Sequence, residues 1–264
     1  MSPFGWPASG CGSSLLSRVG ADALGREVLD LLARARLDTT LIQVDPRHPT
    51  GTVTVDTTDP GRVRYDIVAP AAWDFIEVPP GPSPASAAVL VYGSLAARNE
   101  VSRRTLFHLL DAAALRVFDV NLRSPFTARD VIETLLARAD WAKVNAEELA
   151  EIAGWNNGTD EIETAARSVA ERYGLRAICV TLGAEGAGLL HEGRWYRQPG
   201  FRVPVIDTIG CGDSFLAGWL ARMLMGDLPD EALLWGAAVG ALVAARPGAN
   251  PEFDLAEVED LIGR

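Results

Sequence analysis

The chain has 264 residues, 48% of them hydrophobic, and carries a formal charge of −11 from 24 basic and 35 acidic side chains. The hydrophobic content supports a sizeable core and argues against disorder. The acidic balance without a Lys/Arg cluster argues against a nucleic-acid-binding surface. The three histidines are scattered and the three cysteines lack metal-ligand spacing, which disfavours a zinc site and fits free thiols in a reducing compartment. No apolar run approaches the ~18 residues of a membrane span and no signal peptide is recognisable, so we expect a cytoplasmic protein.

The first third of the chain predicts a strand, a helix and a hairpin. SSLLSRVG, residues 13–20, is typical of a short buried strand, and residues 22–36 have the apolar spacing of a helix. TGTVTVD (50–56) and RVRYDIV (62–68) alternate with period two around the turn residues TTDPG, which predicts a hairpin with one solvated face. The proline-rich residues 79–86 then mark a boundary.

Beyond this boundary, strands alternate with helices. Strands are predicted at 87–93, 115–121, 140–145 and 176–183, and helices at 99–114, 127–139, 160–174 and through most of 211–262. Such alternation implies right-handed crossovers between parallel strands. The predicted fold class is therefore α/β, with a three-layer Rossmann-like parallel sheet, helices on both faces and a small β lid formed by the hairpin.

Four of these predicted strands end in glycine or polar residues, at Gly93, 119–123, 143–148 and 181–186. Ligands of open parallel sheets bind outside the carboxyl ends of the strands, so each end is a candidate binding position. Strand ends also need turn and cap residues, and for any single end the two interpretations are about equally good. Four such ends in one sheet favour a binding site.

The stretch DTIGCGDSF, residues 207–215, places glycines and a carboxylate at the start of a helix. Glycines allow successive N–H groups to face one space, and a helix beginning there adds its positive end. This pattern favours an anion site for a phosphoryl group, beside which Asp213 would act as general base for an attacking hydroxyl. The alternative is that Asp213 only caps the helix.

At these residues the sequence resembles the ribokinase-like, or PfkB, family of sugar kinases. DTIGCGDSF is similar to the family's D-T-x-G-A-G-D signature, with Cys211 in place of the usual alanine. In family order, FDVNLR resembles the D-x-N-x-R stretch of fructokinase-like members, KVNAEE the N-x-x-E motif and VTLGAEG the T-x-G-x-x-G nucleotide loop. ARPGAN resembles the segment that closes the nucleotide and cation site. The resemblance implies a kinase domain over 14–264, with a β lid at about 50–76.

The resemblance also implies a role for each matching residue. Asp213 would take the proton of a sugar hydroxyl, while the backbone of Gly210, Cys211 and Gly212 would hold the phosphoryl group of ATP. The other implied roles are nucleotide binding by Thr181, Gly183, Gly186 and Gly248; phosphate or substrate contacts by Gly93, Asn121, Arg123 and Lys143; Mg²⁺ held through water by Asn145 and Glu148; and a monovalent cation such as K⁺ at Asp207, Ile209, Val243, Arg246 and Gly248. The implied partners are a sugar, ATP and a second copy of the chain bound through the lid, with no nucleic acid and no membrane.

One departure from the family leaves two hypotheses open. Family members begin with a strand carrying a sugar-binding aspartate and a G-G-x-x-x-N segment, whereas MSPFGWPASGCGSS contains no Gly-Gly pair, asparagine or aspartate. The chain is therefore either an ATP-dependent sugar kinase with fructose-like specificity or a truncated remnant that binds nucleotide or a partner without turnover. A nicotinamide enzyme is disfavoured, because the glycines of GAEGAG do not follow the G-x-G-x-x-G order of a dinucleotide-binding motif and the stretch follows a late strand.

Overall fold

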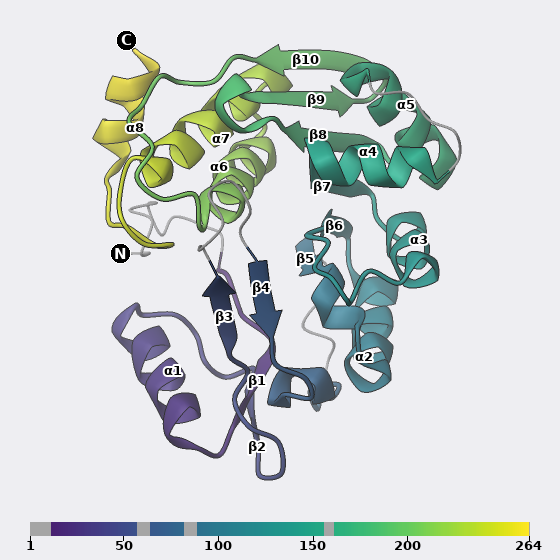
Figure 1. Ribbon diagram of the computed structural model, residues 1–264, viewed down its shortest axis with the longest axis vertical. Coiled ribbons are helices and arrows are strands. Elements are labelled where there is room, and N and C mark those ends of the chain that lie inside the picture. The colour runs from purple at the N-terminus through teal and green to yellow at the C-terminus, as the bar shows by residue number, and fades with distance from the viewer. Residues whose placement is uncertain (1–11, 57–63, 82–88, 156–160, 264) are drawn as a thin grey trace. The chain divides into compact units, whose positions relative to one another are not determined.

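The computed structural model describes residues 12–56, 64–81, 89–155 and 161–263 (Figure 1). They form two compact units. The first unit comprises the described residues of Met1–Arg116 and Leu122–Ile132, and the second those of Val117–Asn121 and Glu133–Arg264.

The first unit opens with the predicted strand and helix. β1 (Ser17–Gly20) leads into α1 (Ala23–Arg34), where the Asp22 carboxylate caps the helix by accepting the Gly25 N–H at 2.8 Å. β2 (Ile42–Asp45) pairs in parallel with β1. The apolar face of α1 is only partly covered, since Leu24 and Leu31 are 47% and 55% exposed.

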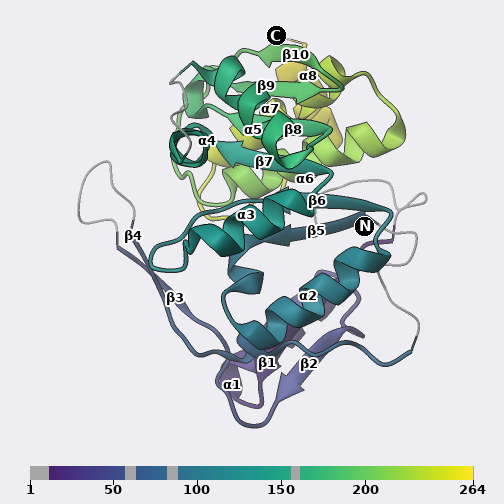
Figure 2. The ribbon, with the colours of Figure 1, turned by 90° about the vertical axis from the view of Figure 1, so that its right-hand side faces the viewer.

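The predicted hairpin is also present. β3 (Val53–Asp56) and β4 (Arg64–Ile67) pair antiparallel, with Val53 opposite Ile67 (Figure 2). The expected turn TTDPG lies outside the described residues. The unit continues through η1 (Ala72–Phe75), β5 (Val89–Gly93), η2 (Ser94–Ala97) and α2 (Glu100–Ala112), and both β6 (Leu115–Asp119) and α3 (Arg129–Ala137) are shared between the units.

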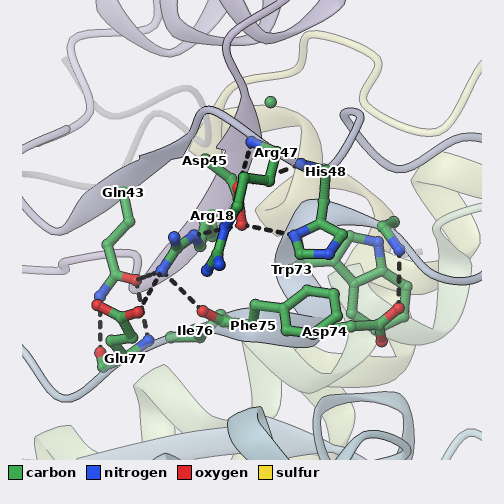
Figure 3. Close-up of polar contacts among 12 residues, drawn as sticks. Arg18, Gln43, Asp45, Arg47, His48, Trp73, Asp74, Phe75, Ile76 and Glu77 are labelled. Carbon is green, nitrogen blue, oxygen red and sulfur yellow. Dashed lines mark hydrogen bonds and ion pairs between the residues drawn. The ribbon is translucent and has the colours of Figure 1, made fainter.

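A buried ion-pair cluster connects β1 and β2 to the last residue of η1 (Figure 3). The Arg18 Nε lies 3.0 Å from Asp45 Oδ2, and its Nη1 donates to the Phe75 carbonyl at 2.8 Å. His48 lies 3.0 Å from the same carboxylate through Nδ1, and its ring stacks on Phe75. Burial would raise the pKa of Asp45, but N–H donors of Arg47 and His48, together with Arg18, lower it to about 2. The carboxylate is therefore ionised and stabilises this corner of the unit.

The second unit contains a mixed sheet in the order β10-β9-β8-β7-β6. β6, β7 (Trp141–Asn145) and β8 (Ala177–Thr181) are parallel, as predicted. β9 (Ala187–His191) and β10 (Arg194–Gln198) add two antiparallel strands, so the expectation of a purely parallel sheet is wrong at this edge. The reason is two short turns, at residues 183–186 between β8 and β9 and at Gly193 between β9 and β10, which reverse the chain directly instead of through crossover helices.

Helices cover both faces of this sheet, as the three-layer prediction requires. α4 (Ala146–Gly154) and α5 (Ile162–Tyr173) lie on one face, and α6 (Cys211–Met225) and α7 (Pro229–Ala244) on the other (Figure 1). α8 (Leu255–Ile262) packs against α7. The first four residues of β7, β8 and β9 are buried, which is the pattern of strands covered on both sides. No helix in the described ranges has the length and apolar character needed to cross a membrane.

Candidate active site

The DTIGCGDSF stretch forms a tight turn that leads directly into α6, whose first residue is Cys211. Gly210 is the N-cap residue, with φ 80° and ψ −8°. A Cβ atom there would lie 2.3 Å from the Ala249 carbonyl oxygen, so both the backbone angle and the space require glycine. Asp213 is the third residue of the helix. The interpretation of Asp213 as the helix cap is therefore wrong, because a cap precedes the first helical residue.

The Asp207 carboxylate holds this turn against the loop that follows α7. Its Oδ1 accepts the Ile209 N–H at 2.9 Å, and its Oδ2 accepts the Gly248 N–H at 3.1 Å. The N–H groups of Ile206 and Asp207 both donate to the Ala244 carbonyl oxygen, at 2.7 and 3.2 Å. Three residues expected to share one loop, Asp207, Ile209 and Gly248, are thus brought together.

Glycines in α7 fix the position of α6. A Cβ atom at Gly236 would lie 2.9 Å from the Cβ of Trp219, and one at Gly240 would lie 3.3 Å from the carbonyl oxygen of Cys211. Trp219 is fully buried between the helices. Larger side chains on α7 would push the helices apart, so this close packing sets where the first turn of α6 lies.

The first turn of α6 retains backbone donors without acceptors. The Cys211 N–H makes only a long bond of 3.4 Å to the Thr208 carbonyl, and regular helical bonding begins at Ser214. Within the part of the chain that the structure describes, the N–H groups of Gly212 and Asp213 have no acceptor. These donors and the positive end of the helix suit an anion such as a phosphoryl group.

The Asp213 carboxylate stands beside these donors. It is exposed and has no hydrogen-bond or ion-pair partner among the described residues. The neighbouring Cys211 thiol is no competitor as a reactive group, because burial and the nearby Asp207 raise its pKa. A protonated thiol is a poor nucleophile. Asp213 is therefore the side chain of this turn that is free to accept a proton.

A buried ion pair lies under the same turn. Lys143 near the end of β7 and Asp119 at the end of β6 are opposite each other in register, and Nζ lies 2.9 Å from Asp119 Oδ1. The residues are 4% and 6% exposed. Burial raises the pKa of Asp119, Lys143 opposes that shift, and the charge of Asp213 adds to it. A Cβ atom on Gly212 would lie 3.0 Å from Nζ, so the ammonium lies against the backbone of the anion site.

Asn145 and Glu148 form the capping box of α4 at the end of β7. Asn145 Oδ1 accepts the Glu148 N–H at 2.8 Å, and Glu148 Oε2 accepts the Asn145 N–H at 3.0 Å. Among the described residues there is no group of three or more acidic, histidine or cysteine side chains that could hold a metal ion. One carboxylate and one amide nevertheless fit a hydrated Mg²⁺, which takes few protein ligands and uses water and substrate phosphates for the rest.

The predicted nucleotide loop follows β8. Thr181 is opposite Asn145 in register, and its Oγ1 donates to the Val144 carbonyl at 3.4 Å. Gly183 and Gly186 both have left-handed backbone angles, with φ 58° and 97°. A Cβ atom at Gly186 would lie 2.0 Å from the carbonyl oxygen of Gln198. Glycine is therefore a steric requirement of this turn as well.

The remaining predicted residues, Asn121, Gly93 and Arg123, lie at or after the ends of β5 and β6. Asn121, after β6, has a left-handed φ of 46°, which is uncommon outside glycine and often marks functional sites. Gly93 ends β5, and the Arg123 Nη1 donates to the Leu122 carbonyl at 3.1 Å. Gly93 and Arg123 belong to the first unit, whereas the other predicted site residues belong to the second.

The other two residues of the expected cation loop, Val243 and Arg246, lie at and just after the end of α7. The Val243 carbonyl accepts the Arg246 N–H at 3.1 Å. The Arg246 side chain turns away, donating to the Glu252 carbonyl at 2.5 Å and pairing with Glu257. The Asp207 carboxylate and the carbonyls around it are the oxygen ligands that hard cations prefer.

The sequence pattern alone does not reveal two contributions to the site. Asp119 lies in the FDVNLR stretch, but nothing in that stretch indicates that it is the partner of Lys143. The helix-packing glycines Gly236 and Gly240 lie outside every predicted motif. Their small-residue spacing in residues 236–240, GAAVG, is the signal that could have indicated close packing.

The sequence pattern of the family described as pfkB family carbohydrate kinase matches residues 8–254. The chain is 32% identical to a fructokinase of Klebsiella pneumoniae, over 83% of this chain and 73% of that protein. It is 29% identical to a fructokinase of Salmonella typhimurium, over 91% and 82% of the two chains. A solved structure of the Vibrio cholerae O395 fructokinase, in a form binding fructose, ADP and calcium ion, matches with a TM-score of 0.83 and 27% identity, over 95% of this chain and 85% of that one.

Proposed function

Because the chain belongs to the pfkB family of carbohydrate kinases, we propose that it transfers the γ-phosphoryl group of ATP to a hydroxyl of fructose or a closely related sugar. The observation that carries this proposal is the first turn of α6. There an exposed carboxylate without a partner among the described residues, Asp213, stands beside N–H groups that have no acceptor. The fructokinases that the chain resembles support fructose as the first sugar to test.

In the proposed reaction, Asp213 accepts the proton of the attacking sugar hydroxyl. The sugar oxygen forms a bond to the γ-phosphorus as the bond from that phosphorus to the bridging oxygen of ADP breaks. Negative charge on the transferred group is held by the backbone of Gly210, Cys211 and Gly212 and by the positive end of α6. The products are a sugar phosphate, ADP and the proton that Asp213 releases to water.

ATP and a divalent metal ion are the cofactors of this chemistry, and Mg²⁺ is the ion we propose. Asn145 and Glu148 would hold its water ligands at the end of β7, and the ion would offset phosphate charge when bound. Thr181, Gly183, Gly186 and Gly248 would line the nucleotide. We further assign K⁺ or a similar ion to the loop of Asp207, Ile209, Val243, Arg246 and Gly248.

Contacts to the phosphates or to the sugar are proposed for Gly93, Asn121, Arg123 and Lys143, within a kinase domain over 14–264. Residues 50–76, which include the β3–β4 hairpin, would form its lid. A two-stranded sheet is marginal in water unless another surface packs against it. Val53 on the hairpin is 52% exposed. We therefore propose that two copies of the chain pair through this lid.

The test is ADP release from ATP and Mg²⁺ in the presence of fructose, with other hexoses and ribose as alternative acceptors. Fructose is expected to support turnover. ATP with Mg²⁺ at about 100 times its dissociation constant should stabilise the fold by about 2.7 kcal/mol, which a thermal melt detects. A melt that shifts with ATP, combined with no ADP release for any sugar, would replace this proposal with a nucleotide-binding protein lacking turnover. No shift at millimolar ATP would contradict the nucleotide site itself.

A further inference from the structure

A row of three buried side chains crosses the sheet beneath the start of α6. Asp119 on β6 is opposite Lys143 on β7, and Lys143 is opposite Cys179 on β8. Lys143 and Asp119 are 4% and 6% exposed, and Cys179 is fully buried. The row thus places a complete ion pair in the interior of the second unit.

The ion pair is oriented toward the anion site. The Lys143 Nζ is 2.9 Å from Asp119 Oδ1, and it is also the atom nearest to the Cβ position of Gly212, at 3.0 Å. Any side chain at position 212 would displace the ammonium. The glycine therefore allows the ammonium to lie directly under the backbone whose N–H groups face the anion site.

Stability alone gives little reason to keep this arrangement. Replacing a buried ion pair by apolar groups of similar size is often neutral or stabilising, whereas losing one partner is costly. A positive charge next to a helix N-terminus is also unfavourable by itself. Both costs fall when an anion occupies the site, because the ammonium, and not the Asp119 carboxylate, lies against Gly212.

We propose that Asp119 is a positioning residue that holds the Lys143 ammonium under Gly212, where its charge stabilises the phosphoryl group as negative charge builds up on it. The inference rests on the proposed kinase function. It adds that Lys143 acts from beneath the backbone of the anion site, and that Asp119 acts only through Lys143.

Four variants separate this role from a structural one. Lys143→Met removes the charge, Asp119→Leu removes the acceptor that holds it, and Asp119→Asn keeps an acceptor of the same shape. Lys143→Met combined with Asp119→Leu removes the pair altogether. Cys179→Ala is the matched control, because it trims the same buried row without removing a charge.

Lys143→Met and Asp119→Leu should each lower kcat about 100-fold, the usual cost of losing one preorganised electrostatic group, and should lower the melting temperature. Asp119→Asn should retain turnover within about tenfold. The double variant should regain most of the melting temperature, yet keep the low kcat of Lys143→Met. If its kcat recovered together with its melting temperature, the pair would be purely structural and the inference would be wrong.

The relative affinities for ATP and ADP test the inference without any sugar. Calorimetry should show that the wild-type protein binds ATP more tightly than ADP in Mg²⁺, since the ammonium faces the γ-phosphoryl group. Lys143→Met and Asp119→Leu should lose this preference, and Cys179→Ala should keep it. This pattern supports the inference even if no sugar is phosphorylated, which would defeat only the proposed function. A preference that is absent in the wild type, or unchanged in Lys143→Met, overturns the inference.

Discussion

Replacing Asp213 by asparagine separates proton transfer from every structural role of this residue. Asparagine has the same shape, but its amide cannot take a proton from a sugar hydroxyl. The structure limits what else the substitution can change. Asp213 is the third residue of α6, it is exposed, and among the described residues it has no hydrogen-bond or ion-pair partner. The stabilising interaction that the substitution removes is that of a carboxylate with the positive end of the helix.

The two effects differ enough in size to be told apart. The carboxylate–helix interaction at an exposed first turn is worth about 0.3–1 kcal/mol of folding stability. General-base catalysis is typically worth about 10²–10⁴-fold in rate, or about 2.7–5.4 kcal/mol of activation free energy. Asp213→Asn should therefore lower kcat by at least about 100-fold while reducing the free energy of unfolding by less than about 1 kcal/mol.

The assay is ADP release at saturating ATP and sugar, with denaturant unfolding and ATP binding measured on the same samples. Asp230→Asn is the matched control, because Asp230 is an exposed carboxylate in the first turn of α7. It should show a similar small change in stability and unchanged turnover. Turnover of Asp213→Asn within a few-fold of the wild type would refute the assignment of the base. A loss of stability above about 2 kcal/mol would reveal a structural role that the observed contacts do not contain.

Three further predictions concern the turn, the acid stability and the lid. Gly210→Ala should abolish ATP binding, because its Cβ would lie 2.3 Å from the Ala249 carbonyl oxygen. Gly226→Ala at the end of the same helix, with φ 89° and open space, should lower the free energy of unfolding by only about 1–2 kcal/mol and leave ATP binding intact. Equal ATP affinities of the two variants would contradict this prediction. The pKa of Asp45 is lowered from 3.8 to about 2, so the stability that its carboxylate contributes is present above pH 4 and is lost as the pH falls to 2. In Asp45→Asn, the free energy of unfolding should therefore change less with pH between 4 and 2. A pH dependence equal to that of the wild type would contradict this prediction. Sedimentation should show a dimer that Val53→Asp on the β3–β4 hairpin converts to a monomer, and a wild-type monomer would exclude pairing through the lid.

Much of the site could be predicted because its requirements are local. Gly210, Gly183 and Gly186 need left-handed backbone angles, and the pattern of glycines before an apolar helix indicates an anion site without knowledge of the fold. The parallel strands β6, β7 and β8 were equally predictable, since continuous apolar runs between helices are typical of strands that are buried on both faces.

The features that could not be predicted depend on register and packing. The pairing of Asp119 with Lys143 follows from which residues face each other across two strands, and the sequence does not specify that register. The antiparallel β9 and β10 are different, because the two-residue turn of Glu192 and Gly193, with left-handed angles at both positions, is a local hairpin signal that a prediction from strand and helix alternation does not use. The helix at residues 22–36 was predicted, but apolar spacing does not say how much of an apolar face is covered, and Leu24 and Leu31 are 47% and 55% exposed.

The way the helices begin gives the strongest physical argument for where an anion binds. α1, α2, α4, α5 and α8 each start at a residue whose side chain accepts a first-turn N–H. α7 also starts without a side-chain cap, at Leu228, but Pro229 in its first turn has no N–H to satisfy. α6 starts at Gly210, which has no side chain to offer, and its first turn contains no proline. Two other carboxylates near this turn are engaged, Asp207 by Ile209 and Gly248, and Asp119 by Lys143.

Five helices of this chain are capped by side chains, and the carboxylates of Asp207 and Asp119 near the turn are paired, yet the N–H groups of Gly212 and Asp213 in α6 have no protein acceptor among the described residues. A side chain with an oxygen acceptor in place of Gly210 would clash with Ala249, and the packing of Gly240 against Cys211 leaves no room to shift the helix. The free donors and the free carboxylate of Asp213 are thus consequences of the same close packing. N–H groups left open at the start of a helix are satisfied by water or by a ligand. A phosphoryl group beside a sugar hydroxyl would bring negative charge to these N–H groups and a proton to Asp213.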